Sequence, residues 1–154
     1  MANANLKQNV DEFKVKNNAW CFTYEGTEVM VMKIPATDYW AGVDGNVYSV
    51  KSGAINRLKP SDNGIGYLKI RLSTKEGMKS QYIHRLIANA WYENGDVDAM
   101  GNFRNEINHI DGNKSNNKLC NLERCSKHEN SEHHCRVLKS EDFILWRTQR
   151  TVTK

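Results

Sequence analysis

The feature that most constrains the fold of this chain is a segment at residues 106–138, where two short stretches flank a turn-rich loop. Residues 106–109 (EINH) and 119–125 (LCNLERC) have the length and mixed polarity of short strands. The loop between them, IDGNKSNNK, consists largely of turn-forming residues. Ser126 followed by Glu129 is a capping box and predicts a helix that runs to about residue 138. The segment therefore predicts a strand, a loop, a strand and a helix in direct succession.

The residues before this segment carry the pattern of antiparallel strands. Runs of aromatic and β-branched residues at 20–24 and 29–34 are separated by a Glu-Gly-Thr turn. Asp44-Gly45 lies between two further apolar runs, at 39–43 and 46–50, and is a strong hairpin signal. The N-terminal half of the chain is thus predicted to be a meander of short strands.

A further strand is predicted at residues 66–72, where two kinds of side chain alternate. One face carries the apolar residues Leu68, Ile70 and Leu72. The other face carries an aromatic ring between two cations, namely Tyr67, Lys69 and Arg71. The second face suits contact with nucleic acid, and a solvated strand face explains it equally well.

Helical spacing of apolar residues predicts a helix at 83–92, which would link the strands to the 106–138 segment. Shorter helical patterns occur at 5–16 and after Ser140. Residues 93–105 have the composition of an acidic loop.

The distribution of charge is compatible with a polyanionic partner. The chain carries 22 Lys and Arg against 18 Asp and Glu, which gives a net charge of +4. Residues 51–79 hold seven cations against two carboxylates, and residues 114–154 hold nine against five. Residues 80–113, between them, are acidic. Two basic segments suit nucleic acid, although on charge alone an ordinary solvated surface explains them better.

Several classes of protein are excluded. No apolar run approaches the roughly 20 residues of a membrane span, and residues 1–10 lack the apolar middle of a secretory signal. We therefore expect no membrane partner, a reducing compartment and no disulfide framework for the four cysteines. Cys120, Cys125 and Cys135 with His128 leave a zinc site open. Because paired CxxC motifs are missing, we expect free thiols and no structural zinc.

The polar residues of the predicted β-β-α unit are suited to phosphodiester hydrolysis. Asn108 and His109 end the first strand, Asn121 opens the second, and Asn130 and His133 lie on one side of the helix. Hydrolysis needs a base, a cation near the phosphorane and groups that hold both. A neutral imidazole makes His109 the candidate base, and Asn121 is a candidate to supply or organise the contact that fixes the tautomer of its ring. The amide oxygens of Asn108 and Asn130 are candidate ligands of a hard divalent ion.

These residues resemble the HNH endonucleases, and within them the phage and intron-type homing endonucleases. The matching stretches are IHRL at 83–86 with the aromatic pair at 91–92, INHIDGNK at 107–114, Asn116-Asn117, NLE at 121–123 and SKHENSEH at 126–133. The resemblance puts the family's general base on His109, its central asparagine on Asn121 and its metal ligands on Asn108 and Asn130. Residues 39–72 are similar to the small β module that often precedes the nuclease core and is implicated in DNA binding.

The resemblance implies an α+β fold in three parts. These are an antiparallel β module at 1–80, a ββα-metal (HNH, or His-Me finger) nuclease core at 81–138 and a short C-terminal helix or tail at 139–154. It implies a homing-endonuclease-like enzyme that uses Mg²⁺ or Mn²⁺ to hydrolyse double-stranded DNA. One active site per chain favours nicking, by a monomer or a homodimer. A bacteriophage protein in the cytoplasm of a host cell is implied as well.

Contacts to DNA are expected from cations and one ring in both basic segments and in the linking helix. They are Lys51, Arg57, Lys59, Tyr67, Lys69, Arg71, Arg85, Lys114 and Lys118. Secondary candidates for the site are His84, Asp111 and His133.

Two positions depart from the family pattern. Many relatives carry an acidic residue or His where Asn108 stands, and many end with His where Asn130 stands. Two neutral amides make a weak cation site, because affinity for hard ions rises with ligand charge. DNA phosphate would have to contribute. The alternative function is therefore an HNH-fold DNA-binding protein with weak or no catalysis.

Overall fold

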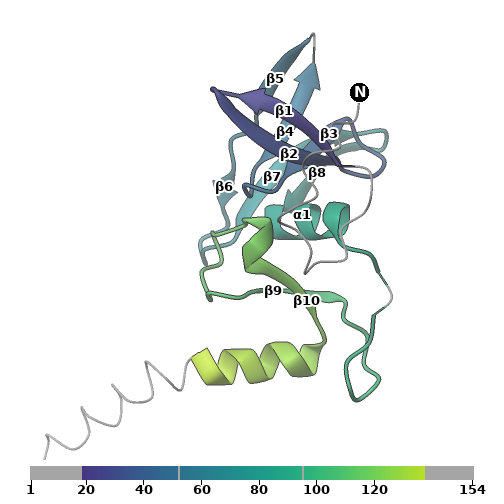
Figure 1. Cartoon of the computed structure of the whole chain (residues 1–154), viewed down its shortest axis with the longest axis vertical. Helices are drawn as coiled ribbons and strands as arrows, with labels where there is room; N and C mark the ends of the chain where they lie inside the picture. Colours follow the sequence, from purple (N-terminus) through teal and green to yellow (C-terminus); the bar gives the residue numbers. More distant parts are fainter. Residues whose placement is uncertain (1–18, 52, 95, 138–154) are drawn as a thin grey trace, which may run out of the picture.

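The computed structural model describes residues 19–51, 53–94 and 96–137. Within these residues, antiparallel sheets lie above a helix, and a β hairpin and a second helix lie below it (Figure 1). The helices predicted at 5–16 and after Ser140, and the tail at 139–154, lie outside the described residues.

The first five strands form one antiparallel sheet in the order β1-β2-β3-β4-β5. Their bounds are Trp20–Tyr24, Thr27–Lys33, Tyr39–Gly42, Val47–Lys51 and Ala54–Arg57. The predicted Asp44-Gly45 hairpin is confirmed, since it joins β3 to β4. The Asp44 carboxylate closes this turn by accepting hydrogen bonds from the backbone N–H and the side-chain amide of Asn46, at 3.2 and 2.7 Å.

A second antiparallel sheet contains β6 (Ser61–Asp62), β7 (Leu68–Thr74) and β8 (Gly77–Tyr82). The strand predicted at 66–72 is β7, which begins two residues later and ends two residues later. The sequence gives no signal for β8, because its residues GMKSQY are mostly exposed and polar and show no alternation. This strand forms through pairing with β7, in a register that places Lys69 opposite Tyr82.

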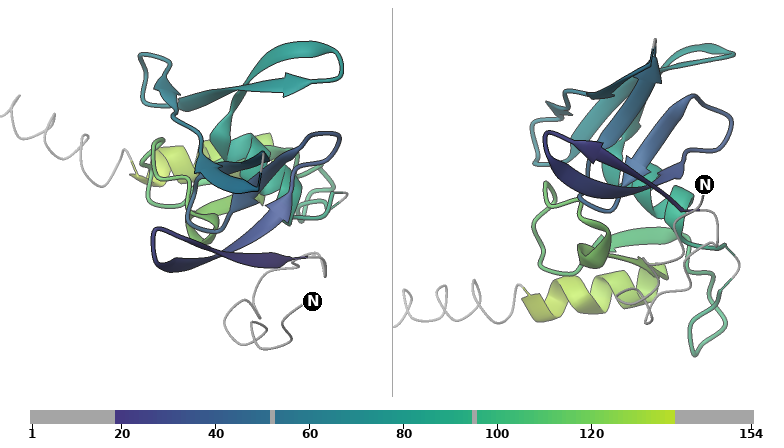
Figure 2. Two further views of the ribbon diagram at one scale, coloured as in Figure 1. Left: turned by 90° about the horizontal axis from the view of Figure 1, so that it is seen from above. Right: turned by 45° about the horizontal axis from the view of Figure 1, so that its top comes forward.

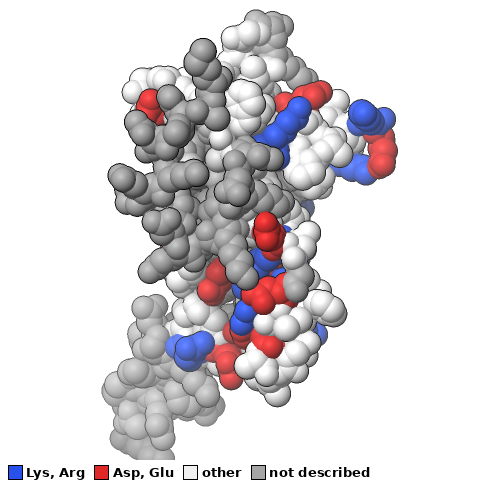
Figure 3. Space-filling view, turned by 45° about the vertical axis from the view of Figure 1, so that its right-hand side comes forward, with Lys and Arg blue, Asp and Glu red and all other residues white. Residues whose placement is uncertain are grey.

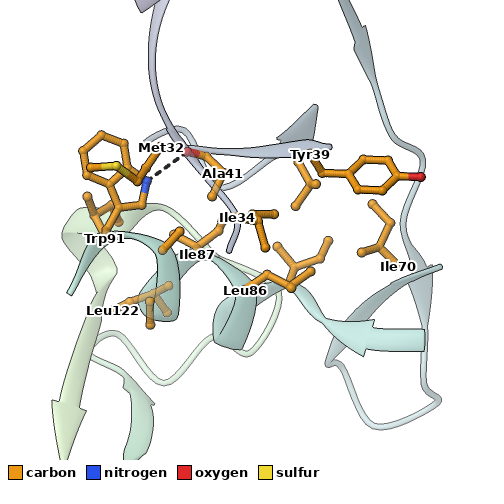
Figure 4. Packing of buried hydrophobic residues seen from close by; sticks show 14 of the residues in the cluster. Met32, Ile34, Tyr39, Ala41, Ile70, Leu86, Ile87, Trp91 and Leu122 are labelled. Carbon is orange, nitrogen blue, oxygen red and sulfur yellow. Dashed lines mark hydrogen bonds between the residues drawn. The ribbon is translucent and has the colours of Figure 1, made fainter. Parts of the chain in front are cut away.

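The helix α1 (Ile83–Trp91) connects the two sheets to the rest of the fold and confirms the helix predicted at 83–92. Its buried face includes Leu86, Ile87 and Trp91, which pack against β3, β7 and β10 in one apolar cluster (Figure 4). The indole N–H of Trp91 donates to the carbonyl oxygen of Ala41 at 2.9 Å. The core therefore extends across residues 80 and 81, the predicted boundary between the β module and the nuclease core.

The β-β-α unit follows a loop at residues 92–105. The strand β9 (Glu106–His109) pairs with β10 (Leu122–Cys125), and residues 127–137 are helical and lie beneath this hairpin (Figures 1 and 2). The strand predicted at 119–125 needs correction, because a 3₁₀ turn at Leu119–Asn121 takes its first three residues. The chain must turn there to leave the loop before it can pair with β9.

The capping box that predicted the second helix is present. The Ser126 backbone N–H donates to the Glu129 carboxylate at 2.9 Å, and the Glu129 N–H donates to Ser126 Oγ at 3.2 Å. The hydroxyl of Ser126 also donates to the carboxylate of Asp98 at 2.6 Å. Arg104 contacts Glu129 through two guanidinium nitrogens. The 92–105 loop thus fixes the start of the helix that carries Asn130.

Candidate active site

The hairpin of β9 and β10 has two faces of different chemistry. Side chains alternate along a strand, so Glu106 and Asn108 share one face while His109 points to the other. In the pairing register, Asn108 lies opposite Glu123 and His109 lies opposite the fully buried Leu122. The candidate base and the candidate metal ligand are thus neighbours in sequence that lie on opposite faces.

His109 is buried at the end of β9, with 5% of its surface exposed. Its Nε2 lies 3.0 Å from the amide oxygen of Asn117, in the loop that joins β9 to β10. An amide oxygen only accepts hydrogen bonds, so Nε2 carries the proton and Nδ1 is left with the lone pair. Of the two roles predicted for Asn121, to supply this contact or to organise it, the first belongs to Asn117, which contacts the ring directly.

Asn121 instead organises the loop. Its amide oxygen accepts the backbone N–H of Asp111 at 3.0 Å, and its amide nitrogen donates to the Asp111 carboxylate and to the Asn116 carbonyl. The Asp111 carboxylate also accepts from Asn113 and Asn116. Burial opposes ionisation of Asp111, but hydrogen bonds from Asn116 and Asn121 hold its pKa below the ordinary value. Asn121 and Asp111 together fix the path of the loop that carries Asn117.

The N-terminal β module braces the same loop. The backbone N–H of Leu119 donates to the carbonyl oxygen of Val43 at 2.9 Å. Gly45, in the β3–β4 turn, has a φ of +88°, and a Cβ there would lie 2.7 Å from the carbonyl carbon of Asn117. Only a residue without a side chain fits this contact. The turn therefore packs directly against Asn117, the residue whose side chain contacts His109.

Aromatic rings and imidazoles surround His109 on its buried face. The centroid of His84, on α1, lies 5.1 Å from that of His109, and the Tyr67 centroid lies 5.2 Å from His84 and 6.0 Å from His109. Tyr82 completes this group at 5.5 Å from His84. Burial, with further contributions from His109 and Arg85, lowers the pKa of His84 to about 4, so its ring is neutral at pH 7.

The opposite face carries two amides and two carboxylates. The amide nitrogen of Asn108 donates to Glu123 Oε1 at 2.8 Å, and that of Asn130 donates to Glu106 Oε2 at 2.6 Å. Amide and carboxylate oxygens are the ligands that Mg²⁺ and Mn²⁺ prefer, so the residues present fit such an ion. Among the described residues, no group of three or more His, Cys, Asp or Glu side chains is arranged to hold a metal.

His133, a secondary candidate, lies on the helix one turn after Asn130, and its Nε2 is 3.1 Å from the carbonyl oxygen of Ile110. It joins the helix to the loop that follows His109.

Two of the residues predicted to bind DNA gather beside the ring group. The ammonium of Lys114, from the β9–β10 loop, lies 4.9 Å from the Tyr67 ring, and that of Lys69 lies 5.3 Å from the Tyr82 ring. Sequence segments 45 residues apart thus place cations over two rings of the group that includes His109. Arg57 lies instead on the five-stranded sheet, 5.8 Å from the Tyr24 ring.

The remaining predicted contacts are spread over the surface. Exposed side chains belong to Lys59, Arg71, Arg85 and Lys118. Lys51 is the last residue of β4. Among the described residues on the face drawn in Figure 3, Lys and Arg alternate with Asp and Glu.

The four cysteines are free thiols. Cys125 is buried on β10, Cys21 is half-buried, and Cys120 and Cys135 are exposed. Burial, followed by the carboxylates of Glu123, Glu106 and Glu129, raises the pKa of the Cys125 thiol to about 12.

Sequence reasoning did not single out four residues that the structure places at the site. They are Tyr82, Glu106, Asn117 and Glu123. Asn117 and Glu123 fall inside the motif stretches, so their presence was visible in the sequence but their contacts were not.

Comparisons with known proteins find similar proteins that are named HNH endonucleases. No protein-family model matches the chain. An uncharacterised HNH endonuclease, L245 of Acanthamoeba polyphaga mimivirus, is 37% identical over 100 residues, which cover 65% of this chain and 28% of that protein. A second from the same virus, L247, is 28% identical over 118 residues, covering 73% and 28%. The chain thus spans about a quarter of the length of these curated relatives.

A solved structure is similar as well. It is that of the HNH homing endonuclease I-HmuI, described for its DNA binding and cleavage, with a TM-score of 0.55 and 32% sequence identity. The match covers 69% of this chain and 57% of that one. In the part of the chain that the structure describes, each helix is too short or too polar to traverse a bilayer. The motif series, the strand–loop–strand–helix unit and these matches together support the assignment of the chain to the HNH endonuclease family.

Proposed function

We propose that the chain is a divalent-metal-dependent endonuclease that nicks double-stranded DNA. The observation that carries the proposal is the hydrogen bond between His109 Nε2 and Asn117, which leaves Nδ1 as a base with a fixed direction. The endonuclease names of the relatives, and the DNA cleavage described for the similar structure, support it. Their viral source also supports a viral protein, although the curated relatives come from a mimivirus and not from a bacteriophage.

In the proposed reaction, His109 Nδ1 takes a proton from the attacking water. Asn117 keeps the ring in the required tautomer, and Asn121 and Asp111 hold the loop that carries Asn117. Mg²⁺ or Mn²⁺ held by Asn108 and Asn130 would stabilise the charge that develops on the phosphate oxygens. The products would carry 3′-hydroxyl and 5′-phosphate ends.

We assign substrate contact to the cations beside the site. Lys114 lies over the Tyr67 ring, which neighbours His109, and Lys69 lies over the Tyr82 ring of the same group, where both can neutralise backbone phosphates. Because phosphate contacts release counterions, the affinity for DNA should fall as salt rises. One site per chain cuts one strand, so the primary product is a nick.

The test is cleavage of a supercoiled plasmid with Mg²⁺ or Mn²⁺. The wild-type chain should produce open circles, and His109→Ala should lower the rate by about 10²- to 10⁴-fold. A gel shift on the same DNA should show unchanged binding. The matched control is His134→Ala, which removes an exposed imidazole on the helix and should cut normally. Equal rates for His109→Ala and the wild type would contradict the proposed base.

A second candidate function is DNA binding without cleavage. It is favoured by the neutrality of Asn108 and Asn130, whose amides already contact glutamates. In this case the wild-type chain would shift the plasmid in a gel and would produce no open circles with either metal.

A further inference from the structure

The two amides at the proposed metal-binding positions share one feature: each donates its N–H to a carboxylate. Asn108 is 8% exposed and lies opposite Glu123 in the β9–β10 register, so strand pairing alone sets their contact. Asn130 reaches Glu106 from the helix. Glu106 and Asn108 are two residues apart on β9 and share a face. The four side chains therefore form one continuous group.

We propose that Glu106 and Glu123 are positioning residues of the divalent-metal site, which orient the amides of Asn130 and Asn108 and supply the negative charge that these amides lack. The inference rests on the proposed function, since it takes Asn108 and Asn130 as the metal ligands.

Orientation follows from the geometry of an amide. Its nitrogen and oxygen lie on opposite sides of the same carbon, so fixing the N–H toward a carboxylate turns the oxygen away from it. Among the described residues, no donor is paired with the side-chain oxygen of Asn108 or Asn130, although Asn108 is nine-tenths buried. Both oxygens are thus held in place and remain able to bind a cation.

Charge leads to the same conclusion. Within the described residues, neither Glu106 nor Glu123 forms an ion pair, because Arg104 contacts Glu129 and Asp96 instead. Burial is the main cause of the raised pKa of Cys125, and the nearby carboxylates of Glu123 and Glu106 add to it. Two uncompensated carboxylates beside two amide oxygens favour a hard divalent cation, whose affinity rises with the charge of its surroundings.

The experiment measures Mn²⁺ binding to the full chain by the loss of the free-ion EPR signal, so it does not depend on cleavage. All proteins carry His109→Ala, and each is titrated alone and with a short DNA duplex against a DNA-only blank. Glu106→Gln and Glu123→Gln should each weaken Mn²⁺ binding by about 10- to 100-fold. The matched control is Glu132→Gln, which removes an exposed carboxylate from the helix that carries Asn130 and should bind Mn²⁺ like the parent.

A swap variant separates loss of the pair from loss of the fold. Asn108→Asp combined with Glu123→Gln keeps the net charge and restores a carboxylate–amide pair in reversed order. Its Mn²⁺ affinity should return to within a few-fold of the parent's or exceed it. Failure of the swap to recover binding would overturn the role of Glu123.

The remaining outcomes distinguish this inference from the proposed function. If the parent binds no Mn²⁺ even with DNA, or if neither glutamine variant differs from Glu132→Gln, the inference is wrong, even if the wild-type chain nicks DNA. If binding depends on both glutamates and the wild-type chain cuts no DNA, the inference holds and the proposed function fails.

Discussion

The two faces of the β9–β10 hairpin are built in different ways. His109 lies on a buried face, beside the rings of Tyr67, which precedes β7, and of His84 in α1. The β3–β4 turn packs against Asn117, the partner of His109. Asn108 lies on a polar face, where its contact comes from the paired strand. The N-terminal module thus helps to position the base, together with Asn121 and Asp111. The amides are positioned by the hairpin, the helix and the contacts of Asp98 and Arg104 at the helix start. Changes in the module should reach the base and spare the amides.

The largest effect that would test this comparison is expected from Asn117→Ala. The substitution removes the acceptor for Nε2–H and leaves a buried donor unpaired, at a cost of about 1–3 kcal/mol. If that cost appears in the transition state, nicking slows by about 10- to 100-fold. Rates on supercoiled plasmid measure it, and Mn²⁺ binding should stay at the wild-type level because Asn117 does not contact the amide face.

The control for this change is Asn116→Ala, one residue earlier in the loop. Its side chain contacts Asp111 and not His109, so a smaller loss is expected. Equal losses for the two variants would mean that the loop as a whole, and not the hydrogen bond to His109, sets the rate.

A second test acts from the N-terminal module. Gly45→Ala introduces a side chain at positive φ and against the backbone of Asn117, and should destabilise the fold by about 2 kcal/mol or more. Gly26→Ala is the matched control, because Gly26 has a φ of +78° and nothing within 4 Å of the added Cβ. Thermal melts give the difference in stability. A slower nicking rate in Gly45→Ala alone would show that the turn positions the base.

The sequence predicted the elements whose pattern of apolar or capping residues lies within the element itself. The helix α1 and the strand β9 follow from apolar spacing, and the second helix follows from Ser126 and Glu129. β8 could not be predicted, because a polar edge strand is held by the hydrogen bonds of its neighbour and not by a buried face. The 3₁₀ turn at Leu119–Asn121 was missed for a similar reason, since the path of the preceding loop imposes it.

The same distinction applies to the site. The motif placed Asn108, His109 and Asn130 at element ends, where the structure has them. The partners of these side chains depend on strand register and loop path, which a single sequence does not show. Asn117 and Asn121 are chemically identical and four residues apart, and only the fold decides that the first contacts His109.

A smaller effect is expected at the start of the helix that carries Asn130. Ser126→Ala removes the N-cap and the donor to Asp98, and should cost about 1–2 kcal/mol in a thermal melt. Ser131→Ala removes an exposed hydroxyl from the same helix and should be nearly neutral. If the helix positions only the amide face, Ser126→Ala should weaken Mn²⁺ binding more than it lowers the nicking rate. A larger loss of nicking rate than of Mn²⁺ affinity would mean that the helix also supports His109.

The smallest effect is a change in pH dependence at His84. The buried ring packs against Tyr67, Tyr82 and His109, its Nδ1 has no partner among the described residues, and Arg85 adds positive charge. Because folding lowers the pKa of His84 from 6.5 to about 4, the unfolded chain binds this proton first, and stability falls as the pH drops through that interval.

His84→Phe should therefore show a smaller fall in melting temperature across the upper part of this interval than the wild type, with His134→Phe as the exposed control. The contribution can be isolated there, because the pKa values of Asp98, Asp111 and Glu129 lie below their ordinary values of 3.8 and 4.5, so these carboxylates lose their stabilising charge only at lower pH. Identical curves for His84→Phe and the wild type would mean that His84 is hydrated in solution. Water would then reach the buried face of the hairpin, and the two faces would differ less in hydration than we propose.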